Sequence, residues 1–252
     1  DVSIELLNVD CMDYMAGLKD KAFDICITSP PYNMNLRVNS KGSGYCSRQI
    51  VKELSSKYSG FDDNLPMADY ENFLITTMSE ILRVSGLVFF NIQMITGNKP
   101  ALFRFMGHFS NQIKELIIWD KCKAQPAIGE GVLNSGYELI IVLGDKPITR
   151  AFQSPKFKRG TVNNIWRIPA GKSSDKNHRA AFPLLLAETI LKNFDINGSK
   201  VFDPFLGTGT SAIAAHHSGL DFVGCELDED YYNAAMKRFD NETRQIDLLG
   251  EL

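Results

Sequence analysis

The chain has 252 residues, of which 44% are hydrophobic, 23% are charged and 10% are aromatic, a composition typical of one globular α/β domain. This composition excludes disordered and fibrous chains. No apolar run approaches the roughly 20 residues that span a bilayer, and the first five residues lack the basic and apolar pattern of a signal peptide. We therefore expect a cytoplasmic protein.

The net charge of -3 conceals an uneven distribution along the chain. Residues 145–179 contain nine basic and two acidic residues, a net charge of +7, whereas the rest has eighteen basic and twenty-eight acidic residues, a net charge of -10. The basic residues of this segment are Lys146, Arg150, Lys156, Lys158, Arg159, Arg167, Lys172, Lys176 and Arg179. The segment is therefore a candidate for binding a polyanionic partner.

The five cysteines are an odd number and are widely spaced, with no Cys-x-x-Cys pair and no histidine at ligand spacing. They are Cys11, Cys26, Cys46, Cys122 and Cys225. We expect neither a disulfide framework nor a metal site.

Short apolar runs rich in β-branched residues alternate with helical patterns, which favours a mostly parallel sheet covered by helices in a single domain, residues 1–252. Seven strands are predicted at residues 3–7, 23–27, 87–91, 115–119, 138–143, 200–202 and 221–225. Helices are predicted at residues 67–84, 98–109, 180–194, 210–218 and 229–239. The turn region at 129–136 predicts that the two strands flanking it are antiparallel.

Two segments lack this alternation. Residues 37–60 are rich in Ser, Gly and Lys, contain five basic residues against Glu53, and are predicted to form a mobile loop. Residues 145–179, the basic segment, are broken into short pieces by prolines and glycines. Within it, Trp166 could stack on a nucleic acid or anchor a small hydrophobic cluster.

Residues 28–33, Thr-Ser-Pro-Pro-Tyr-Asn, directly follow the apolar strand at 23–27. Two consecutive prolines fix φ and remove two N–H donors, so this turn is rigid. Its position at a carboxyl strand end is where α/β sheets bind ligands. Ser29 Oγ and the Pro30 carbonyl could accept hydrogen bonds from an amino group, and the Tyr32 ring could stack on a planar base. A proline turn whose tyrosine caps the core is the alternative.

Residues 201–210, Val-Phe-Asp-Pro-Phe-Leu-Gly-Thr-Gly-Thr, lie between a short strand and a helix, and Glu226 ends the next strand. Such glycines allow close approach of a nucleoside cofactor, and a carboxylate at the position of Glu226 can accept hydrogen bonds from ribose hydroxyls. No Gly-Lys-Ser/Thr follows, which excludes a P-loop. Asp203 would repel a pyrophosphate and favour a cation such as S-adenosylmethionine. A ligand-free glycine turn and a nicotinamide dehydrogenase are alternatives, and the latter leaves residues 29–32 unexplained.

In combination these motifs resemble those of a known family. Residues 28–33 resemble the catalytic motif of the DNA amino-methyltransferases, and residues 203–210 resemble their cofactor motif. Their order along the chain is similar to that of the circularly permuted β group. Residues 177–183 resemble the segment before the cofactor loop, and residues 8–11 resemble the acidic turn on the adenine side of the cofactor. The resemblance covers nearly the whole chain.

The resemblance implies a Rossmann-like, seven-stranded methyltransferase sheet, S-adenosylmethionine as methyl donor, and double-stranded DNA as substrate. Target recognition is assigned to residues 145–179, with the 37–60 loop also facing DNA. The implied cofactor-binding residues are Asp10, Cys11, Thr28, His178, Asp203, Pro204, Phe205, Gly207, Gly209, Thr210, Glu226 and Leu227. The DNA-binding candidates are Arg37, Lys41, Arg48, Lys156, Lys158, Arg159 and Arg167. A second copy of the chain and a cognate restriction endonuclease are partners that the sequence leaves open.

The predicted reaction is methylation of the exocyclic amino group of a flipped base, with Ser29, Pro30, Pro31 and Tyr32 as catalytic residues. This nitrogen is a poor nucleophile because its lone pair is delocalised into the ring. Acceptors such as Ser29 Oγ and the Pro30 carbonyl would favour the geometry in which the lone pair is free. Attack on the sulfonium methyl is then a direct displacement. Methylation at cytosine carbon 5 is disfavoured because no proline is followed by a cysteine.

The residue at position 29, the first position of the Ser-Pro-Pro-Tyr motif, favours cytosine over adenine as the target base. Ser29 resembles the cytosine-N4 enzymes more than the Asp of most adenine enzymes, so N4 of cytosine is favoured and N6 of adenine is the alternative. A methyltransferase of RNA or of a protein amide, or a non-catalytic DNA-binding relative, would carry similar motifs, and these are the alternatives of another class.

Overall fold

The computed structural model describes residues 2–33, 64–125, 130–144, 149–153, 155–170, 182–194 and 198–250. The predicted loop at 37–60, with Arg37, Lys41 and Arg48, lies outside the described residues, as does His178. Of the basic segment, residues 149–153 and 155–170 are described.

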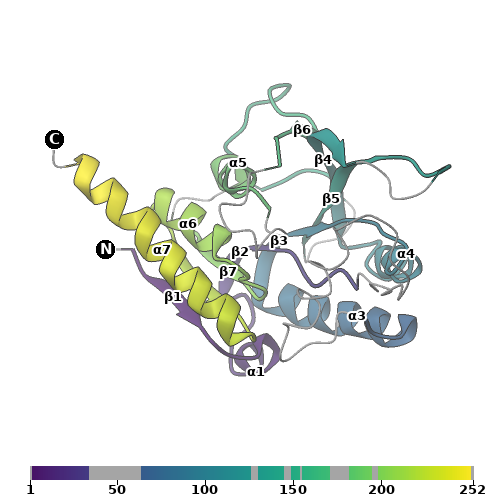
Figure 1. The fold of residues 1–252 in the computed structure, drawn as a ribbon, viewed down its shortest axis with the longest axis horizontal. Coiled ribbons are helices and arrows are strands. Elements are labelled where there is room, and N and C mark those ends of the chain that lie inside the picture. Colours follow the sequence, from purple (N-terminus) through teal and green to yellow (C-terminus); the bar gives the residue numbers. More distant parts are fainter. Residues whose placement is uncertain are drawn as a thin grey trace.

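The described residues form a mixed sheet with helices on both faces (Figure 1). Its strands are β1 (Ile4–Leu7), β2 (Phe23–Thr28), β3 (Ser85–Ile92), β4 (Ile113–Gln125), β5 (Ser135–Gly144), β6 (Ile165–Arg167), β7 (Lys200–Asp203) and β8 (Asp221–Cys225). The helices are α1 (Cys11–Ala16), α3 (Met67–Val84), α4 (Lys99–His108), α5 (Leu184–Phe194), α6 (Thr210–His217) and α7 (Glu229–Gly250). All seven predicted strands and all five predicted helices are present in the described residues.

The prediction of seven strands was wrong by one, because the described sheet has eight strands in the order β1-β8-β7-β2-β3-β5-β4-β6. The additional strand, β6, has only three residues and lies in the basic segment, too short for a period-two pattern to stand out. Helix α1 was also not predicted. It has six residues and begins where the Asp10 carboxylate accepts a hydrogen bond from the Met12 N–H at 2.7 Å.

Strand direction follows the predicted pattern. Strand β5 is antiparallel to both β3 and β4, which confirms the antiparallel pair expected on either side of the 129–136 region. The pairs β1–β8, β8–β7, β7–β2 and β2–β3 are all parallel. The carboxyl ends of these five strands therefore lie at one edge of the sheet, where α/β proteins bind their ligands.

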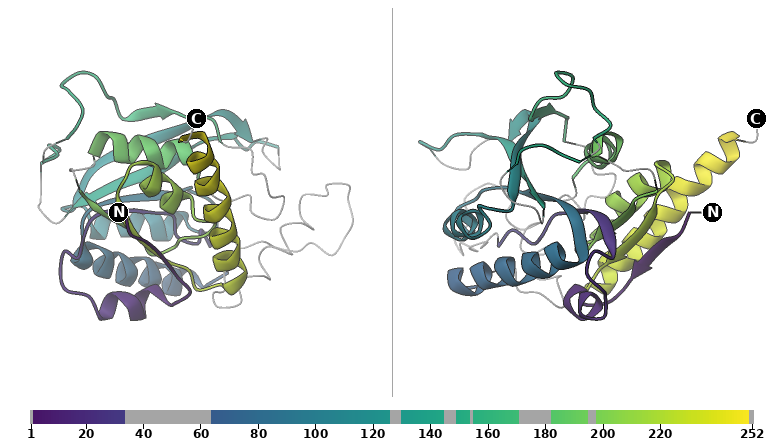
Figure 2. Two further views of the ribbon diagram at one scale, coloured as in Figure 1. Left: turned by 90° about the vertical axis from the view of Figure 1, so that its left-hand side faces the viewer. Right: turned by 180° about the vertical axis from the view of Figure 1, so that it is seen from behind.

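Each face of the sheet is covered by its own helices and has its own hydrophobic cluster. One cluster joins α1, α3 and α4 to side chains such as Phe90 and Phe202, and the other joins α5, α6 and α7 to side chains such as Phe89 and Val201. Figure 2 shows the two helical layers from the side and from behind. Because successive residues of a strand point to opposite faces, strands buried on both sides read as continuous apolar runs. No helix in the described part of the chain is long and apolar enough to cross a membrane.

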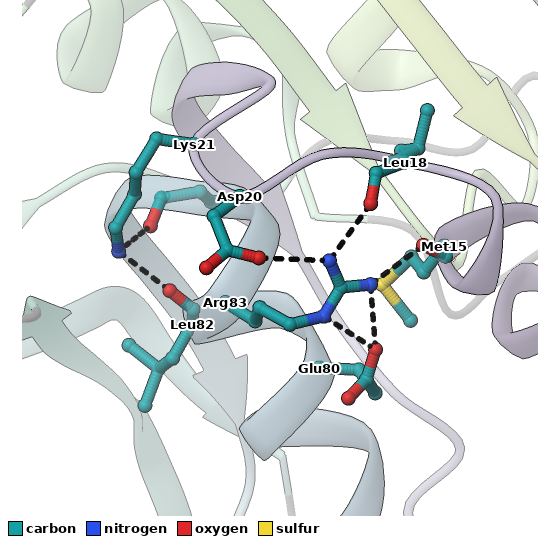
Figure 3. Close-up of polar contacts among 8 residues, drawn as sticks. Met15, Leu18, Asp20, Lys21, Glu80, Leu82 and Arg83 are labelled. Atoms are coloured by element: carbon teal, nitrogen blue, oxygen red, sulfur yellow. Dashed lines mark hydrogen bonds and ion pairs between the residues drawn. The ribbon is translucent and has the colours of Figure 1, made fainter.

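A polar cluster around Arg83, near the end of α3, fastens the connection between α1 and β2 (Figure 3). The Arg83 guanidinium donates to the main-chain carbonyls of Met15 and Leu18 at 2.7 and 2.8 Å. It also pairs with the carboxylates of Glu80 and Asp20 at 2.8 and 3.1 Å. Since this connection leads directly into β2, the cluster helps to place the turn that follows β2.

Replacing Arg83 with alanine is expected to lower the melting temperature by several degrees, because two main-chain carbonyls lose their donor and the connection loses its anchor. Arg104→Ala is the matched control, since the Arg104 side chain is 59% exposed and pairs with Glu71 at the surface. Thermal unfolding of both variants checks the difference. Equal melting temperatures for the two variants would show that the Arg83 cluster has no special role in stability.

Candidate active site

The two sequence motifs lie side by side at the carboxyl edge of the sheet. Strands β2 and β7 are parallel neighbours, with Cys26 opposite Phe202. Strand β2 leads into the turn at 28–33, and β7 leads into the glycine loop at 204–209. A buried hydrogen bond of 2.7 Å from Thr28 Oγ1 to Asp203 Oδ1 joins them. Segments that are 175 residues apart in the sequence are thus joined into one site.

The Asp203 carboxylate is the polar centre of this junction and is only 1% exposed. Besides the Thr28 hydroxyl, it accepts hydrogen bonds from the Ser211 hydroxyl in α6 and from the Phe205 N–H at 3.0 Å. Burial raises the pKa of Asp203 to about 6, although these hydrogen bonds favour the charged form. Asp203 therefore holds the turn, the glycine loop and the start of α6 together. Its direct contact with a cofactor stays a prediction.

The glycine loop needs its glycines for both conformation and space. Gly207 and Gly209 have φ values of 54° and 78°, in the left-handed region that side chains disfavour. A Cβ atom on Gly209 would also lie 3.3 Å from the Cβ of Ala235 in α7. From the same helix, Arg238 donates hydrogen bonds to the Thr208 carbonyl at 3.2 Å and to the Thr210 hydroxyl at 2.9 Å. Helix α7 thus packs against the glycine loop and stabilises its conformation.

Glu226 follows β8 and faces the same loop. One carboxylate oxygen accepts a hydrogen bond from the Gly207 N–H at 2.8 Å, and the other accepts one from the Asp228 N–H at 2.9 Å. Glu226 is 9% exposed, and burial raises its pKa to about 7. On its other side, the Asn8 side chain donates to the Glu226 carbonyl at 2.9 Å, which ties the end of β8 to the end of β1.

The structure gathers the predicted cofactor-binding residues that it describes at adjacent strand ends. Asp10 and Cys11 lie beyond β1, Leu227 lies beyond β8, and Thr28 ends β2. The residues of the β7 loop and the start of α6 are Asp203, Pro204, Phe205, Gly207, Gly209 and Thr210. Because β1, β8, β7 and β2 are consecutive in the sheet, these groups line one continuous edge.

The turn after β2 is anchored by side chains of neighbouring segments. The Tyr70 hydroxyl donates to the Pro31 carbonyl at 2.7 Å, and the Asn98 side chain donates to the Tyr32 carbonyl at 2.9 Å. Asn33, which has a φ of 55° and is 1% exposed, accepts a hydrogen bond from the Leu65 N–H at 2.7 Å. The two prolines and these contacts hold the turn in one conformation.

Ser29 and Tyr32 interact with each other through their hydroxyl groups. Ser29 Oγ donates to the Tyr32 hydroxyl at 3.0 Å. The Tyr32 hydroxyl in turn contacts Glu138 Oε2 in β5 at 3.0 Å and Asn91 Oδ1 in β3 at 3.3 Å. Burial, together with the nearby Glu138, raises the pKa of Tyr32 well above its ordinary value, so the hydroxyl stays protonated. The turn therefore offers an ordered chain of polar groups.

A family model of DNA methylases, those of the N6 and N4 type, matches residues 23–237, which include both motifs. The chain belongs to the DNA methylase family.

Individual relatives agree with this assignment. The type II methyltransferase M.MthZI of Methanothermobacter thermautotrophicus is 28% identical over 92% of this chain and 75% of its own length. Among solved structures, the cytosine-N4-specific PvuII DNA methyltransferase has a TM-score of 0.68 at 13% identity, covering 97% of this chain and 93% of the other. TTHA0409 of Thermus thermophilus, solved with S-adenosyl-L-methionine, has a TM-score of 0.63 at 22% identity, with 95% of each chain covered. These two likenesses concern the fold.

Three residues that contact the candidate site were not predicted from the sequence. Glu138 and Lys121, in neighbouring strands, form a largely buried ion pair at 3.2 Å, and Glu138 also contacts Tyr32. Arg238 contacts the glycine loop from α7. A charged residue at the start of the apolar run 138–143 was a signal for Glu138 that sequence reasoning did not use. Nothing local distinguishes Arg238 from the other basic residues of an amphipathic helix.

The described DNA-binding candidates lie on the surface of the protein. Lys156, Lys158, Arg159 and Arg167 are all exposed. Arg167 lies in β6 and is 3.5 Å from the Asp120 carboxylate. Their exposure is compatible with phosphate binding, and that role stays a prediction.

Trp166 of the DNA methylase lies in the hydrophobic cluster rather than on the surface. It is 7% exposed, its ring centroid is 6.4 Å from that of Phe194, and its indole N–H donates to the Asn163 carbonyl. Of the two roles considered for Trp166, the structure supports the anchoring of a cluster. Beside it lies a groove of about 550 Å³, lined in part by Arg150, Arg159 and Phe157.

The buried carboxyl groups predict how stability depends on pH. The pKa values of Asp203 and Glu226 are raised to about 6 and about 7, so the folded protein keeps these protons to higher pH than the unfolded chain does. Their contribution to the unfolding free energy is therefore full below about pH 4 and is lost as the pH rises through 6 and 7. Urea unfolding across this range should show a flatter pH profile for Asp203→Asn and Glu226→Gln than for the wild type. Parallel profiles would contradict the assignment.

Proposed function

We propose that this DNA methylase transfers a methyl group from S-adenosylmethionine to the exocyclic amino nitrogen of a base in double-stranded DNA. The observation that carries the proposal is the Thr28–Asp203 hydrogen bond, which joins the proline turn to the glycine loop. A group bound over the loop and a base bound at the turn would meet at this junction. The favoured target is N4 of cytosine, and N6 of adenine is the alternative.

The edge formed by β1, β8 and β7 suits the cofactor. It combines a glycine loop in the left-handed conformation with the carboxylates of Asp10, Asp203 and Glu226, which favour a cationic nucleoside over a pyrophosphate. When bound, S-adenosylmethionine supplies an electrophilic methyl group on a positively charged sulfur. Glu226 would accept hydrogen bonds from ribose hydroxyls, and Asp10 and Cys11 would lie on the adenine side of the cofactor. Leu227, 45% exposed, offers an apolar surface there.

At the turn, Ser29 Oγ and the Pro30 carbonyl would accept hydrogen bonds from the target amino group. This contact favours the pyramidal nitrogen of the transition state over the planar ground state. Pro31 keeps the turn rigid, and the Tyr32 ring would stack on the base after it leaves the duplex. The turn therefore orients the nitrogen toward the methyl group without a covalent intermediate.

Labelled methyl transfer tests the substrate class. The protein is incubated with S-adenosylmethionine labelled in the methyl group and with duplex DNA, RNA or protein in parallel. We expect label in DNA. Label confined to RNA or protein would refute the proposal.

Phosphate contacts in the basic segment make DNA binding dependent on salt. We expect the dissociation constant for duplex DNA to rise with salt concentration, and each phosphate-contacting cation to contribute a slope of about 0.9 in a double-logarithmic plot. Lys158→Ala and Arg159→Ala should each reduce this slope by about one, whereas Arg104→Ala in α4 should not. Fluorescence anisotropy at several salt concentrations measures the slopes. If all variants show the same salt dependence of the dissociation constant, DNA binds at a different surface of the protein.

The catalytic strand β2 precedes the cofactor strands β7 and β8 in the chain, which we interpret as the circular permutation of the β group. The 37–60 loop, with Arg37, Lys41 and Arg48, is proposed to contact DNA, and His178 is proposed to contact the cofactor. A homodimer and a cognate restriction endonuclease are proposed partners. The cytoplasm, where S-adenosylmethionine and DNA are available, is the proposed location.

A further inference from the structure

Glu138 ends a chain of hydrogen bonds that begins at the catalytic turn. Ser29 Oγ donates to the Tyr32 hydroxyl at 3.0 Å, and the Tyr32 hydroxyl donates to Glu138 Oε2 at 3.0 Å. The other carboxylate oxygen of Glu138 pairs with the Lys121 ammonium at 3.2 Å. The four residues come from the β2 turn, β5 and β4, so only the folded chain assembles them.

The Lys121–Glu138 ion pair is largely shielded from solvent. The side chains of Lys121 and Glu138 are only 9% and 11% exposed. Desolvation of two charges can cost as much as their attraction returns, so stability alone is a weak explanation for such a pair. Its contact with Tyr32 points instead to a role at the turn.

The Lys121–Glu138 ion pair sets the donor-to-acceptor direction of the hydrogen bonds between Ser29, Tyr32 and Glu138. An ammonium group only donates hydrogen bonds and an ionised carboxylate only accepts them, so the Tyr32 hydroxyl must donate its proton to Glu138. The Tyr32 oxygen is then the acceptor for the Ser29 hydroxyl. With its hydrogen used in this way, Ser29 Oγ presents its lone pairs. The Asn91 amide oxygen, at 3.3 Å, is a second and longer-range acceptor for Tyr32.

We propose that Glu138, held by Lys121, is a positioning residue that makes Ser29 Oγ a hydrogen-bond acceptor for the target amino group. This inference rests on the proposed function. As the amino nitrogen bonds to the methyl carbon, the carbon–sulfur bond would break and the sulfur would leave as a neutral thioether. Positive charge develops on the nitrogen until it releases a proton to solvent, and a carboxylate linked to the nitrogen through two hydroxyls would stabilise that charge. Because the effect belongs to the transition state, it should appear in the rate of methyl transfer and leave cofactor affinity unchanged.

The test is a set of single-turnover measurements on duplex DNA. Glu138→Leu, combined with Lys121→Met so that no ammonium is left unpaired, should slow methyl transfer by about 10-fold to 100-fold. Glu138→Gln, whose carbonyl can still accept from Tyr32, should recover part of this loss. Calorimetry should give the same dissociation constant for S-adenosylmethionine in all variants. Glu71→Gln in α3 is the matched control for loss of a paired carboxylate and should keep the wild-type rate.

Repeating the substitutions in a Tyr32→Phe background separates positioning from a general structural role. The hydroxyl link is absent there, so Glu138→Leu with Lys121→Met should add little to the effect of Tyr32→Phe alone. Additive losses would overturn the inference, as would a wild-type rate in the Glu138→Leu protein. These outcomes leave the proposed function intact. A wild-type protein that methylates no DNA would refute both.

Discussion

Replacing Ser29 with alanine is expected to lower kcat for DNA methylation by about 100-fold, because the change removes one preorganised acceptor for the target amino group. Ser29 Oγ donates a hydrogen bond to the Tyr32 hydroxyl, whereas the hydrogen bond from the turn to Asp203, at the start of the glycine loop, comes from Thr28. The dissociation constant for S-adenosylmethionine should therefore stay at the wild-type value. Single-turnover kinetics and calorimetry on the same preparation measure the two quantities.

Ser79→Ala is the control for loss of a serine hydroxyl, since Ser79 lies on the exposed side of α3 and donates to the Ile75 carbonyl in its own helix. It should have no effect on either quantity. A loss of cofactor affinity in the Ser29 variant, or an unchanged kcat, would count against the division of roles between turn and loop.

Replacing Asp203 with alanine is expected to lower both the stability of the protein and its affinity for S-adenosylmethionine. Alanine at this position leaves three buried donors without their acceptor: the hydroxyls of Thr28 and Ser211 and the N–H of Phe205. Since an unsatisfied buried donor costs about 1–3 kcal/mol, we expect the unfolding free energy to fall by about 3 kcal/mol or more. The glycine loop should lose its fixed position, so the affinity for S-adenosylmethionine should also fall.

Urea unfolding and calorimetry measure both effects at Asp203. Asp203→Asn, which keeps one acceptor oxygen for Thr28 and Phe205, should be intermediate in both. A folded Asp203→Ala protein with wild-type cofactor affinity would show that the junction is dispensable for the loop.

Local sequence patterns predicted the elements whose signals are local. The helix at 67–84 and the strand at 221–225 have the predicted bounds, because their apolar periodicity is long or is closed by clear turns. The short elements α1 and β6 were missed, since three to six residues do not establish a period. The end of α7 was also misplaced: the predicted helix ends at Phe239, whereas α7 continues to Gly250.

The residues of the candidate site also differ in how far a local sequence pattern could predict them. Ser29, Tyr32 and Asp203 could be proposed from the sequence because prolines and glycines next to them make each motif recognisable over a few residues. Glu138 was not found, because its contact with Tyr32 joins residues 106 apart in the sequence. Lys121 and Arg238 likewise acquire their partners only through the packing of strands and helices. Residues of this kind require a structure.

Mass spectrometry of nucleosides from duplex DNA, methylated in vitro by the purified wild-type protein, tests the central claim most directly. An amino-directed mechanism at the turn predicts a base methylated on its exocyclic nitrogen, with N4-methylcytosine as the favoured product. N6-methyladenine alone would move the target to adenine and leave the mechanism in place. 5-Methylcytosine as the product, or no methylated nucleoside at all, would contradict the account.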